Sequence, residues 1–132
     1  MRKIIIDTNF LMIPSQFRVD IFSEIDRICS FNYNLLVFEQ SIHELRDIIK
    51  KQGQKHRKAA QLALKLISLK NIEIIKADRN DTDSLILEHA DKDMIVATQD
   101  INLKKRLLEK GVSVIILRQK KYLKLLERKL YK

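Results

Sequence analysis

Residues 3–10, KIIIDTNF, decide the fold class of this 132-residue chain. Three consecutive β-branched isoleucines are typical of a strand that is covered on both faces, as in a parallel sheet between helices. The run stops at Asp7, and Thr8 and Asn9 follow it. A carboxylate at the end of a buried strand either ends the strand without a further role or is part of an active site. The other segments of the chain distinguish these two interpretations.

Four further apolar runs predict buried strands, and they alternate with segments of helical periodicity. The expected strands are residues 35–38, 72–75, 94–97 and 113–117. Apolar residues recur at spacings of three and four between them, as in the predicted helix over residues 15–28. Strands joined by helices predict a three-layer α/β/α fold around a central parallel sheet of about five strands. We expect one domain spanning residues 1–132.

The sequence of the last part of the chain indicates the end of one helix and the presence of a further helix. Gly111 follows a helical segment directly, at the position where a left-handed C-cap is expected. Leu123, Leu126 and Leu130 then recur at helical spacing among lysines. We therefore expect a basic amphipathic helix over about residues 119–131, as part of the same domain.

The net charge of the chain is +9, and the whole excess lies in its C-terminal quarter. Residues 102–132 contain 11 lysines and arginines against two acids. Clustered cations favour a polyanionic partner, above all a nucleic acid, because binding to phosphates releases counterions. The alternative is a lysine-rich surface that only keeps the protein in solution. The candidate RNA-binding residues are Lys104, Lys105, Arg106, Arg118, Lys120 and Lys121.

Cysteine content and hydropathy indicate the compartment. Cys29 is the single cysteine, so no disulfide can form within the chain, which fits a reducing environment. No apolar stretch approaches the roughly 18 residues needed to span a bilayer. We therefore expect a cytoplasmic protein that does not associate with membranes.

Acidic residues follow the predicted strands where a parallel sheet collects its ligands. Such sheets bind ligands beyond the carboxyl ends of their strands, and four carboxylates can reach that edge. The four are Asp7, Glu44, Asp83 and Asp100. Taken singly, Asp83 and Asp100 are better explained as helix N-caps, and Glu44 as a first-turn acid. Taken together, they would repel one another and raise each other's pKa values unless a cation neutralised them.

A set of oxygen ligands suits a hard divalent ion, so we expect one or two Mg²⁺ or Mn²⁺ ions at this edge. The three histidines show no metal-ligand spacing. Such an ion lowers the pKa of a bound water and neutralises phosphate oxygens, and hydroxide can then attack phosphorus in line. An acidic metal site beside a basic surface therefore indicates hydrolysis of phosphodiester bonds in a nucleic acid.

The ordered motifs resemble those of the PIN-domain ribonucleases over nearly the whole chain. The matching segments are IIIDTNFLM at 4–12, the glutamate of SIHELRDI at 41–48, TDSLILEHA at 82–90 and IVATQDINLKKRL at 95–107. The resemblance implies a PIN-like fold and Mg²⁺- or Mn²⁺-dependent endoribonuclease activity, in a toxin-type or an RNA-processing role. It makes Asp7, Glu44, Asp83 and Asp100 the catalytic and metal-binding acids.

The same resemblance gives supporting roles to Thr8, Asn9 and Thr98, which would hold carboxylates and waters. It also implies RNA as the substrate, an antitoxin or a ribosome-assembly partner, and a homodimer. Residues 111–126 are more similar to the archaeal-type and ribosomal-RNA-processing endonucleases than to short plasmid-borne VapC toxins. Asn102 departs from the pattern, because relatives often carry a second acid there. The side-chain carbonyl of Asn102 could support the site, but it carries no charge. The site could therefore hold either one or two metal ions.

Other classes of protein also begin with a strand that ends in aspartate. A haloacid-dehalogenase-type phosphatase needs a second aspartate where Asn9 stands. A response-regulator receiver needs an acidic pair at the first strand, which supplies Asp7 alone. The remaining alternative is a non-catalytic PIN-like scaffold that binds RNA or a protein. Asn102 favours that alternative, and the four acids oppose it.

Overall fold

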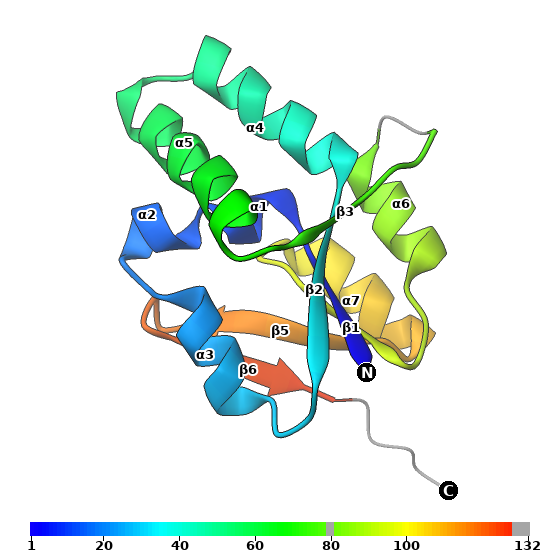
Figure 1. Ribbon diagram of the computed structural model, residues 1–132. Helices are drawn as coiled ribbons and strands as arrows, with labels where there is room; N and C mark the ends of the chain where they lie inside the picture. The colour runs from blue at the N-terminus through cyan, green and yellow to red at the C-terminus, as the bar shows by residue number, and fades with distance from the viewer. Residues whose placement is uncertain (79–80, 128–132) are drawn as a thin grey trace, which may run out of the picture.

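Six strands form one sheet, and helices cover both of its faces in the computed structural model, which describes residues 1–78 and 81–127 (Figure 1). The strands are β1 Arg2–Ile6, β2 Tyr33–Phe38, β3 Glu73–Ile75, β4 Met94–Ala97, β5 Ser113–Arg118 and β6 Tyr122–Leu126. The helices are α1 Thr8–Leu11, α2 Ile13–Phe17, α3 Ile21–Ile28, α4 Glu39–Lys51, α5 Gln54–Leu69, α6 Thr82–His89 and α7 Ile101–Lys110.

The strand order β3-β2-β1-β4-β5-β6 places β1 inside the sheet. The first five strands pair in parallel, and β6 pairs antiparallel with β5. The chain runs outward from β1 to β3 and then returns to β4 on the other side of β1, so the strand order reverses between β1 and β4. Ligands bind beyond the carboxyl ends of the strands at such a reversal. The predicted three-layer α/β/α fold is confirmed, with one strand more than expected.

The isoleucines of β1 supply both layers of the core. Ile4 and Ile6 pack with Leu45 of α4 in the layer formed by α1 to α5. Ile5 faces the other way and packs with Leu103 of α7 in the layer formed by α6 and α7. All five of these side chains are buried. The run is continuously apolar because each face of the strand lies under helices.

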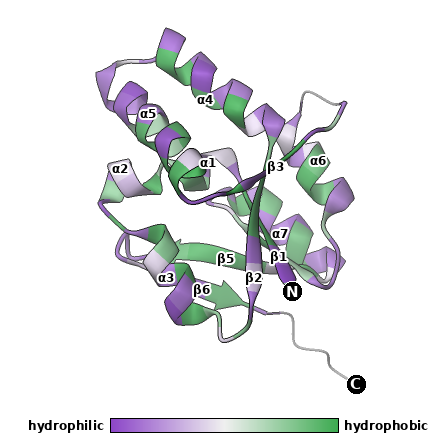
Figure 2. Cartoon of the chain, viewed as in Figure 1, coloured by the Kyte–Doolittle hydropathy of each residue, from purple (hydrophilic) through white to green (hydrophobic). Residues whose placement is uncertain are grey.

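The two long helices show one apolar and one polar side. Hydrophobic and hydrophilic residues alternate along α4 and α5, while the strands inside the molecule are mostly hydrophobic (Figure 2). This pattern fits helices that pack on a sheet with one side and face water with the other. Among the residues that the structure describes, no helix combines the length and the apolar character needed to cross a membrane.

The predicted helix over residues 15–28 is wrong, because two helices form there. Arg18 ends α2 in the left-handed region, with a φ of 55°. Asp20 then begins α3, and its carboxylate accepts hydrogen bonds from the N–H groups of Phe22 and Ser23. The apolar spacing continues across this break, so periodicity alone does not reveal it.

The predicted C-terminal helix over residues 119–131 is also wrong in its described part. Gln119 and Lys120 have φ values of 51° and 56° and form a tight turn. The N–H of Lys121 closes it by donating to the carbonyl of Arg118 at 3.0 Å. Two successive positive φ angles match the twist of a β-hairpin turn, so the chain reverses through residues 119–121 into β6.

Two hydrogen bonds join β6 to α3 at Leu123. The N–H of Leu123 donates to Glu24 Oε1 at 2.9 Å, and Arg27 Nη2 donates to the Leu123 carbonyl at 3.1 Å. Leu123 is buried and Lys124 is exposed, which is the alternation of a strand. Leu130, which contributed to the predicted helix, lies outside the described residues.

The C-cap predicted at Gly111 is confirmed. Gly111 ends α7 with a φ of 91°, and its N–H donates to the carbonyls of Leu107 and Leu108. Glycine has no Cβ to oppose this left-handed conformation. The cap turns the chain directly into β5.

Candidate active site

Asp7 lies at the carboxyl end of β1, where the strand order reverses. Its N–H donates to the carbonyl of Ala97 at the end of β4, at 2.9 Å. The side chain is 4% exposed. Oδ1 accepts a hydrogen bond from the N–H of Thr8 at 2.8 Å, and Oδ2 accepts one from the hydroxyl of Thr98 at 2.7 Å. The carboxylate is thereby fixed in place, and each oxygen keeps a lone pair for another ligand.

The environment of Asp7 disfavours its charged form. Burial raises the pKa of Asp7 from its ordinary value of 3.8 to about 6. The hydrogen bond from Thr98 opposes this effect, and the negative charges of Asp83 and Glu44 add to it. A buried carboxylate beside other carboxylates is a place where a bound cation would relieve the repulsion.

A hydrogen bond joins α4 to α6 at Glu44, and its partner Thr82 directly precedes Asp83 in the sequence. The hydroxyl of Thr82 donates a short hydrogen bond to the Glu44 carboxylate. The first-turn interpretation of Glu44 is wrong, because α4 already begins at Glu39. The N-cap interpretation of Asp83 is also wrong: Asp81 caps α6 and accepts a hydrogen bond from the Asp83 N–H at 3.1 Å.

The Asp83 carboxylate interacts with other charges instead of capping the helix. Burial raises the pKa of Asp83, and the negative charges of Asp100 and Asp81 raise it further. The positive charge of Arg106 has the opposite effect. Asp81 is occupied by its capping role, because the Ser84 hydroxyl donates to it and lowers its pKa. Of Asp81 and Asp83, Asp83 is therefore the residue whose carboxylate is available to bind a ligand.

The N-cap interpretation of Asp100 is confirmed. Asp100 Oδ1 accepts hydrogen bonds from the N–H groups of Asn102 and Leu103 at 2.9 and 3.1 Å. The N–H of Asp100 donates in turn to the Thr98 hydroxyl oxygen at 3.0 Å. No described residue donates to Oδ2. The Asp100 carboxylate can therefore cap the helix through Oδ1 and bind a ligand through Oδ2. Asn102 lies exposed in the first turn of α7.

The four predicted acids form one electrostatic group at the edge of the sheet. Asp7 is affected by the charges of Glu44 and Asp83, and Asp83 by that of Asp100. None of the four makes an ion pair within the described part of the chain. In residues 1–78 and 81–127, no three acids, histidines or cysteines approach closely enough to enclose a metal ion as their side chains stand. The oxygen donors and the uncompensated charge fit a hard cation, toward which the carboxylates would have to turn.

Thr8 and Asn9, which the resemblance gave supporting roles, form hydrogen bonds with partners that the sequence did not predict. The hydroxyl of Thr8 donates to the hydroxyl of Ser41 at 2.7 Å, inside the core. Asn9 Oδ1 accepts from the N–H of Gln99 at 3.2 Å, and Gln99 Nε2 donates to the Asn9 carbonyl at 3.0 Å. Ser41, Thr82 and Gln99 lie within the motif segments, but their hydrogen-bond partners lie far away in the sequence. No local pattern could have identified these pairs.

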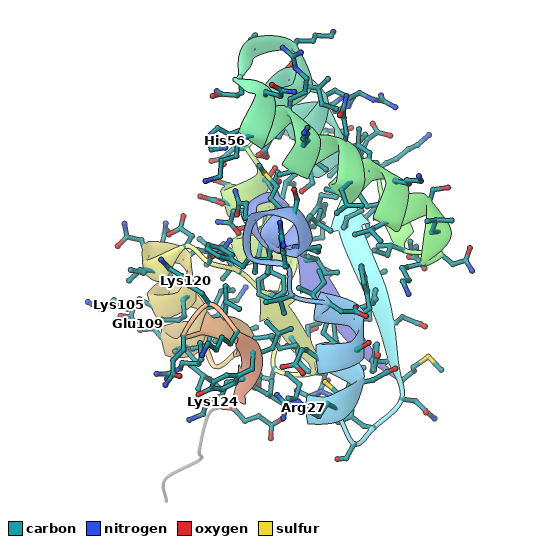
Figure 3. All side chains as sticks on the ribbon, turned by 90° about the vertical axis from the view of Figure 1, so that its left-hand side faces the viewer. Arg27, His56, Lys105, Glu109, Lys120 and Lys124 are labelled. Carbon is teal, nitrogen blue, oxygen red and sulfur yellow. The ribbon has the colours of Figure 1, made fainter. Side chains whose placement is uncertain are left out.

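The candidate RNA-binding residues lie on α7 and around the β5–β6 turn. Lys104 is half-buried, and the exposed ones are Lys105, Arg106, Arg118, Lys120 and Lys121. Because β5 runs parallel to β1, Arg118 at its end lies on the same edge of the sheet as Asp7. Figure 3 shows Lys105 and Lys120 on the same side of the molecule, with His56 far from both.

The sheet order and the acidic edge define a PIN-like domain. Residues 4–120 match the family described as "PIN like domain", and the chain belongs to this family. Ribonuclease VapC4 of Methanocaldococcus jannaschii is 32% identical over 124 residues, which cover 92% of this chain and 95% of that protein.

Solved structures show the same fold. The PIN domain endonuclease Utp24 superposes with a TM-score of 0.72 at 21% identity, over 97% of this chain and 92% of that one. A domain of a functionally unknown protein from M. jannaschii has a TM-score of 0.57 at 16% identity, over 100% and 98% of the two chains.

Proposed function

We propose that this protein is a divalent-metal-dependent endoribonuclease that hydrolyses phosphodiester bonds in RNA. One observation carries the proposal: four carboxylates interact at the reversal point of the sheet with no ion pair in the described residues, although the chain has a net charge of +9. Acids that served stability alone would be expected to pair with some of the 26 basic residues. The relatives named ribonuclease VapC4 and endonuclease Utp24 support this reaction class.

In this proposal Asp7, Glu44, Asp83 and Asp100 hold one or two Mg²⁺ or Mn²⁺ ions. When bound, the ion supplies Lewis acidity, which lowers the pKa of water and screens the charge on phosphate oxygens. The chain supplies the orientation: Thr98 fixes Asp7, and the helix cap fixes Asp100. Fixed ligands matter because small displacements of reacting groups cost much of the rate.

The basic residues would hold the RNA strand without competing for the metal. Lys104, Lys105 and Arg106 follow Asp100 on α7, and Arg118 lies at the end of β5. Phosphates on either side of the scissile bond can contact these cations while the scissile phosphate lies at the acids. Binding of this kind weakens steeply with salt, because each neutralised phosphate releases counterions.

Cleavage of a mixed-sequence single-stranded RNA tests the proposal. Wild type should cleave with Mn²⁺ and not with EDTA, and Asp7→Asn should cleave with neither. Asp47→Asn is the matched control, because it removes the same charge from an exposed position on α4. If wild type and Asp7→Asn cleave equally, the activity is a contaminant or the site lies elsewhere.

The second candidate function is a non-catalytic scaffold that binds RNA or a protein. The neutral Asn102 and the distance between the carboxylates favour it. Titration calorimetry with Mn²⁺ separates the two functions. Saturable binding that is lost in Asp7→Asn supports the nuclease. No saturable Mn²⁺ binding, together with no divalent-dependent cleavage, refutes it and leaves the scaffold.

The cellular role and assembly need separate measurements. A toxin-type enzyme should arrest growth when expressed without an antitoxin, whereas an RNA-processing enzyme should permit growth and yield discrete products from ribosomal RNA. A homodimer should show twice the chain mass of 15.6 kDa in light scattering. Each result decides one part of the proposal independently of the cleavage assay.

A further inference from the structure

A cavity of about 140 Å³ adjoins the acidic edge, at the carboxyl ends of β4 and β5. Its lining residues are Thr98, Gln99, Ile101, Lys104, Ile116 and Leu117. Thr98 also donates to Asp7 and accepts from the N–H of Asp100. Thr98 therefore lies between this cavity and two of the proposed catalytic acids, Asp7 and Asp100.

Gln99 is a lining residue whose side-chain oxygen accepts no hydrogen bond from the described residues. Its Nε2 must face the Asn9 carbonyl, to which it donates at 3.0 Å, because a carbonyl cannot donate. The backbone N–H of Gln99 is held by Asn9 as well. Oε1 therefore points away from Asn9, and no described residue donates to it. A ligand with an N–H group could do so.

The remaining walls are apolar. Ile116 is buried in the sheet and Leu117 is half-buried. Ile101, in the first turn of α7, is 70% exposed although it is a large hydrophobic side chain. The core does not explain this isoleucine, whereas a flat apolar ligand in the cavity would cover it.

Positive charge lies at the rim of the cavity. Lys104 is one of the lining residues, and Arg118 follows Leu117 directly at the end of β5. Lys120 lies in the turn after Arg118. A polyanion that leaves the acidic edge across the cavity would meet Lys104, and Arg118 and Lys120 follow the lining residue Leu117 closely in the sequence.

We propose that this cavity binds one pyrimidine base of single-stranded RNA, from a nucleotide next to the scissile phosphate. The size fits, because a cavity of about 150 Å³ in another protein accommodates benzene, a six-membered ring. Cytosine N4–H or uracil N3–H can donate to Gln99 Oε1, and the ring packs on Ile101. A purine carries a second fused ring, and we expect it to fit this volume less well. The inference rests on the proposed function for its substrate class.

Binding in EDTA tests the subsite without requiring catalysis. Fluorescence anisotropy compares a pyrimidine-only RNA, a purine-only RNA and an abasic strand of the same length. Wild type should bind the pyrimidine strand about fivefold more tightly than the other two, the low end of the effect of one base contact. Ile101→Ala should lose this preference. Ile74→Ala, which truncates another exposed isoleucine on the distant strand β3, should keep it.

Two further results complete the test. Ile101→Tyr should strengthen binding of the pyrimidine strand, because an aromatic ring stacks on a base better than an aliphatic side chain does. Since Ile101 is exposed, circular dichroism should show that both variants fold. Equal affinity for all three strands, no binding of any strand, or a preference that survives in Ile101→Ala would overturn the subsite.

The outcomes separate this inference from the proposed function. Pyrimidine-dependent binding without Mn²⁺-dependent cleavage would support the subsite and refute the nuclease. Mn²⁺-dependent cleavage with no base preference in binding would refute the subsite and support the nuclease.

Discussion

Replacing Asp7 with asparagine should stabilise the metal-free protein at neutral pH. The pKa of Asp7 is about 6 in the folded state against an ordinary value of 3.8, chiefly because the group is buried. The folded state therefore binds more protons between these two values. The favourable contribution of protonated Asp7 is fully present below pH 3.8 and is lost as the pH rises through 6. The difference of about two pKa units corresponds to about 3 kcal/mol.

We expect Asp7→Asn to raise the free energy of unfolding by about 1–2 kcal/mol at pH 7.5, less than the full electrostatic amount. The new amide must donate to the Thr98 hydroxyl, which already accepts from Asp100. At pH 4 the gain should vanish, because Asp7 is then protonated in the folded protein. Urea unfolding in EDTA, followed by circular dichroism across this pH range, measures the difference.

Asp47→Asn serves as the control, because it removes one negative charge from an exposed position on α4. Its effect on the free energy of unfolding should be small at both pH values. If Asp7→Asn changes stability by the same amount at pH 4 and pH 7.5, burial of the charge is not what raises the pKa of Asp7, and the explanation fails.

The remaining predictions concern the turn, the helix cap and the metal. Lys120→Gly should raise the free energy of unfolding by about 1 kcal/mol, because glycine adopts the φ of 56° without strain, and it should weaken RNA binding because a cation is lost. Denaturation and anisotropy measure the two effects, and a variant that is less stable than wild type would contradict the first. Gly111→Ala should lower the free energy of unfolding by about 1 kcal/mol, because its φ is 91°. An unchanged urea midpoint would count against this. Mn²⁺ should raise the melting temperature of wild type and leave that of Asp7→Asn unchanged, so equal increases in calorimetry would exclude Asp7 as a ligand.

The five parallel strands could be predicted from the sequence because burial on both faces leaves a simple pattern. β1 and β5 are apolar over most of their length, so no helix-like spacing competes. β3 fits this pattern of burial on both faces less well, because Ile74 is 45% exposed at the edge of the sheet. The position of β1 between two helical layers also follows from its composition, since a strand covered on both faces has no polar face.

The two errors in the helices have a common physical cause. Arg18, Gln119 and Lys120 adopt left-handed conformations that glycine or asparagine would have signalled. Leu123 and Leu126 fit a helical spacing as well as a strand, and the exposed Lys124 between them was compatible with both. The tertiary bond of Leu123 to Glu24, which favours the strand, joins residues 99 positions apart and leaves no local trace.

At the candidate site, the prediction that four acids form a metal site stays a prediction, and the sequence did not indicate the hydrogen bonds around them. Asp7 and Asp100 follow β1 and β4 directly, so their common edge follows from the parallel sheet. Asp83 was interpreted as a cap because it precedes an apolar run, but Asp81 precedes the same run and is the observed cap. The bonds of Thr82 and Gln99 depend on contacts between elements. Such contacts can be assigned only after the fold is known.

The attachment of Leu123 to Glu24 and Arg27 also governs how the sheet meets other protein molecules. An edge strand normally exposes free N–H and carbonyl groups on which a foreign strand can assemble. Here both outward groups of Leu123 are already bonded to α3. At the opposite edge, β3 is only three residues long. Strand addition would have to break the Leu123 bonds or rely on that short strand, so the sheet is protected against edge-to-edge aggregation, and a dimer would be expected to form through helices.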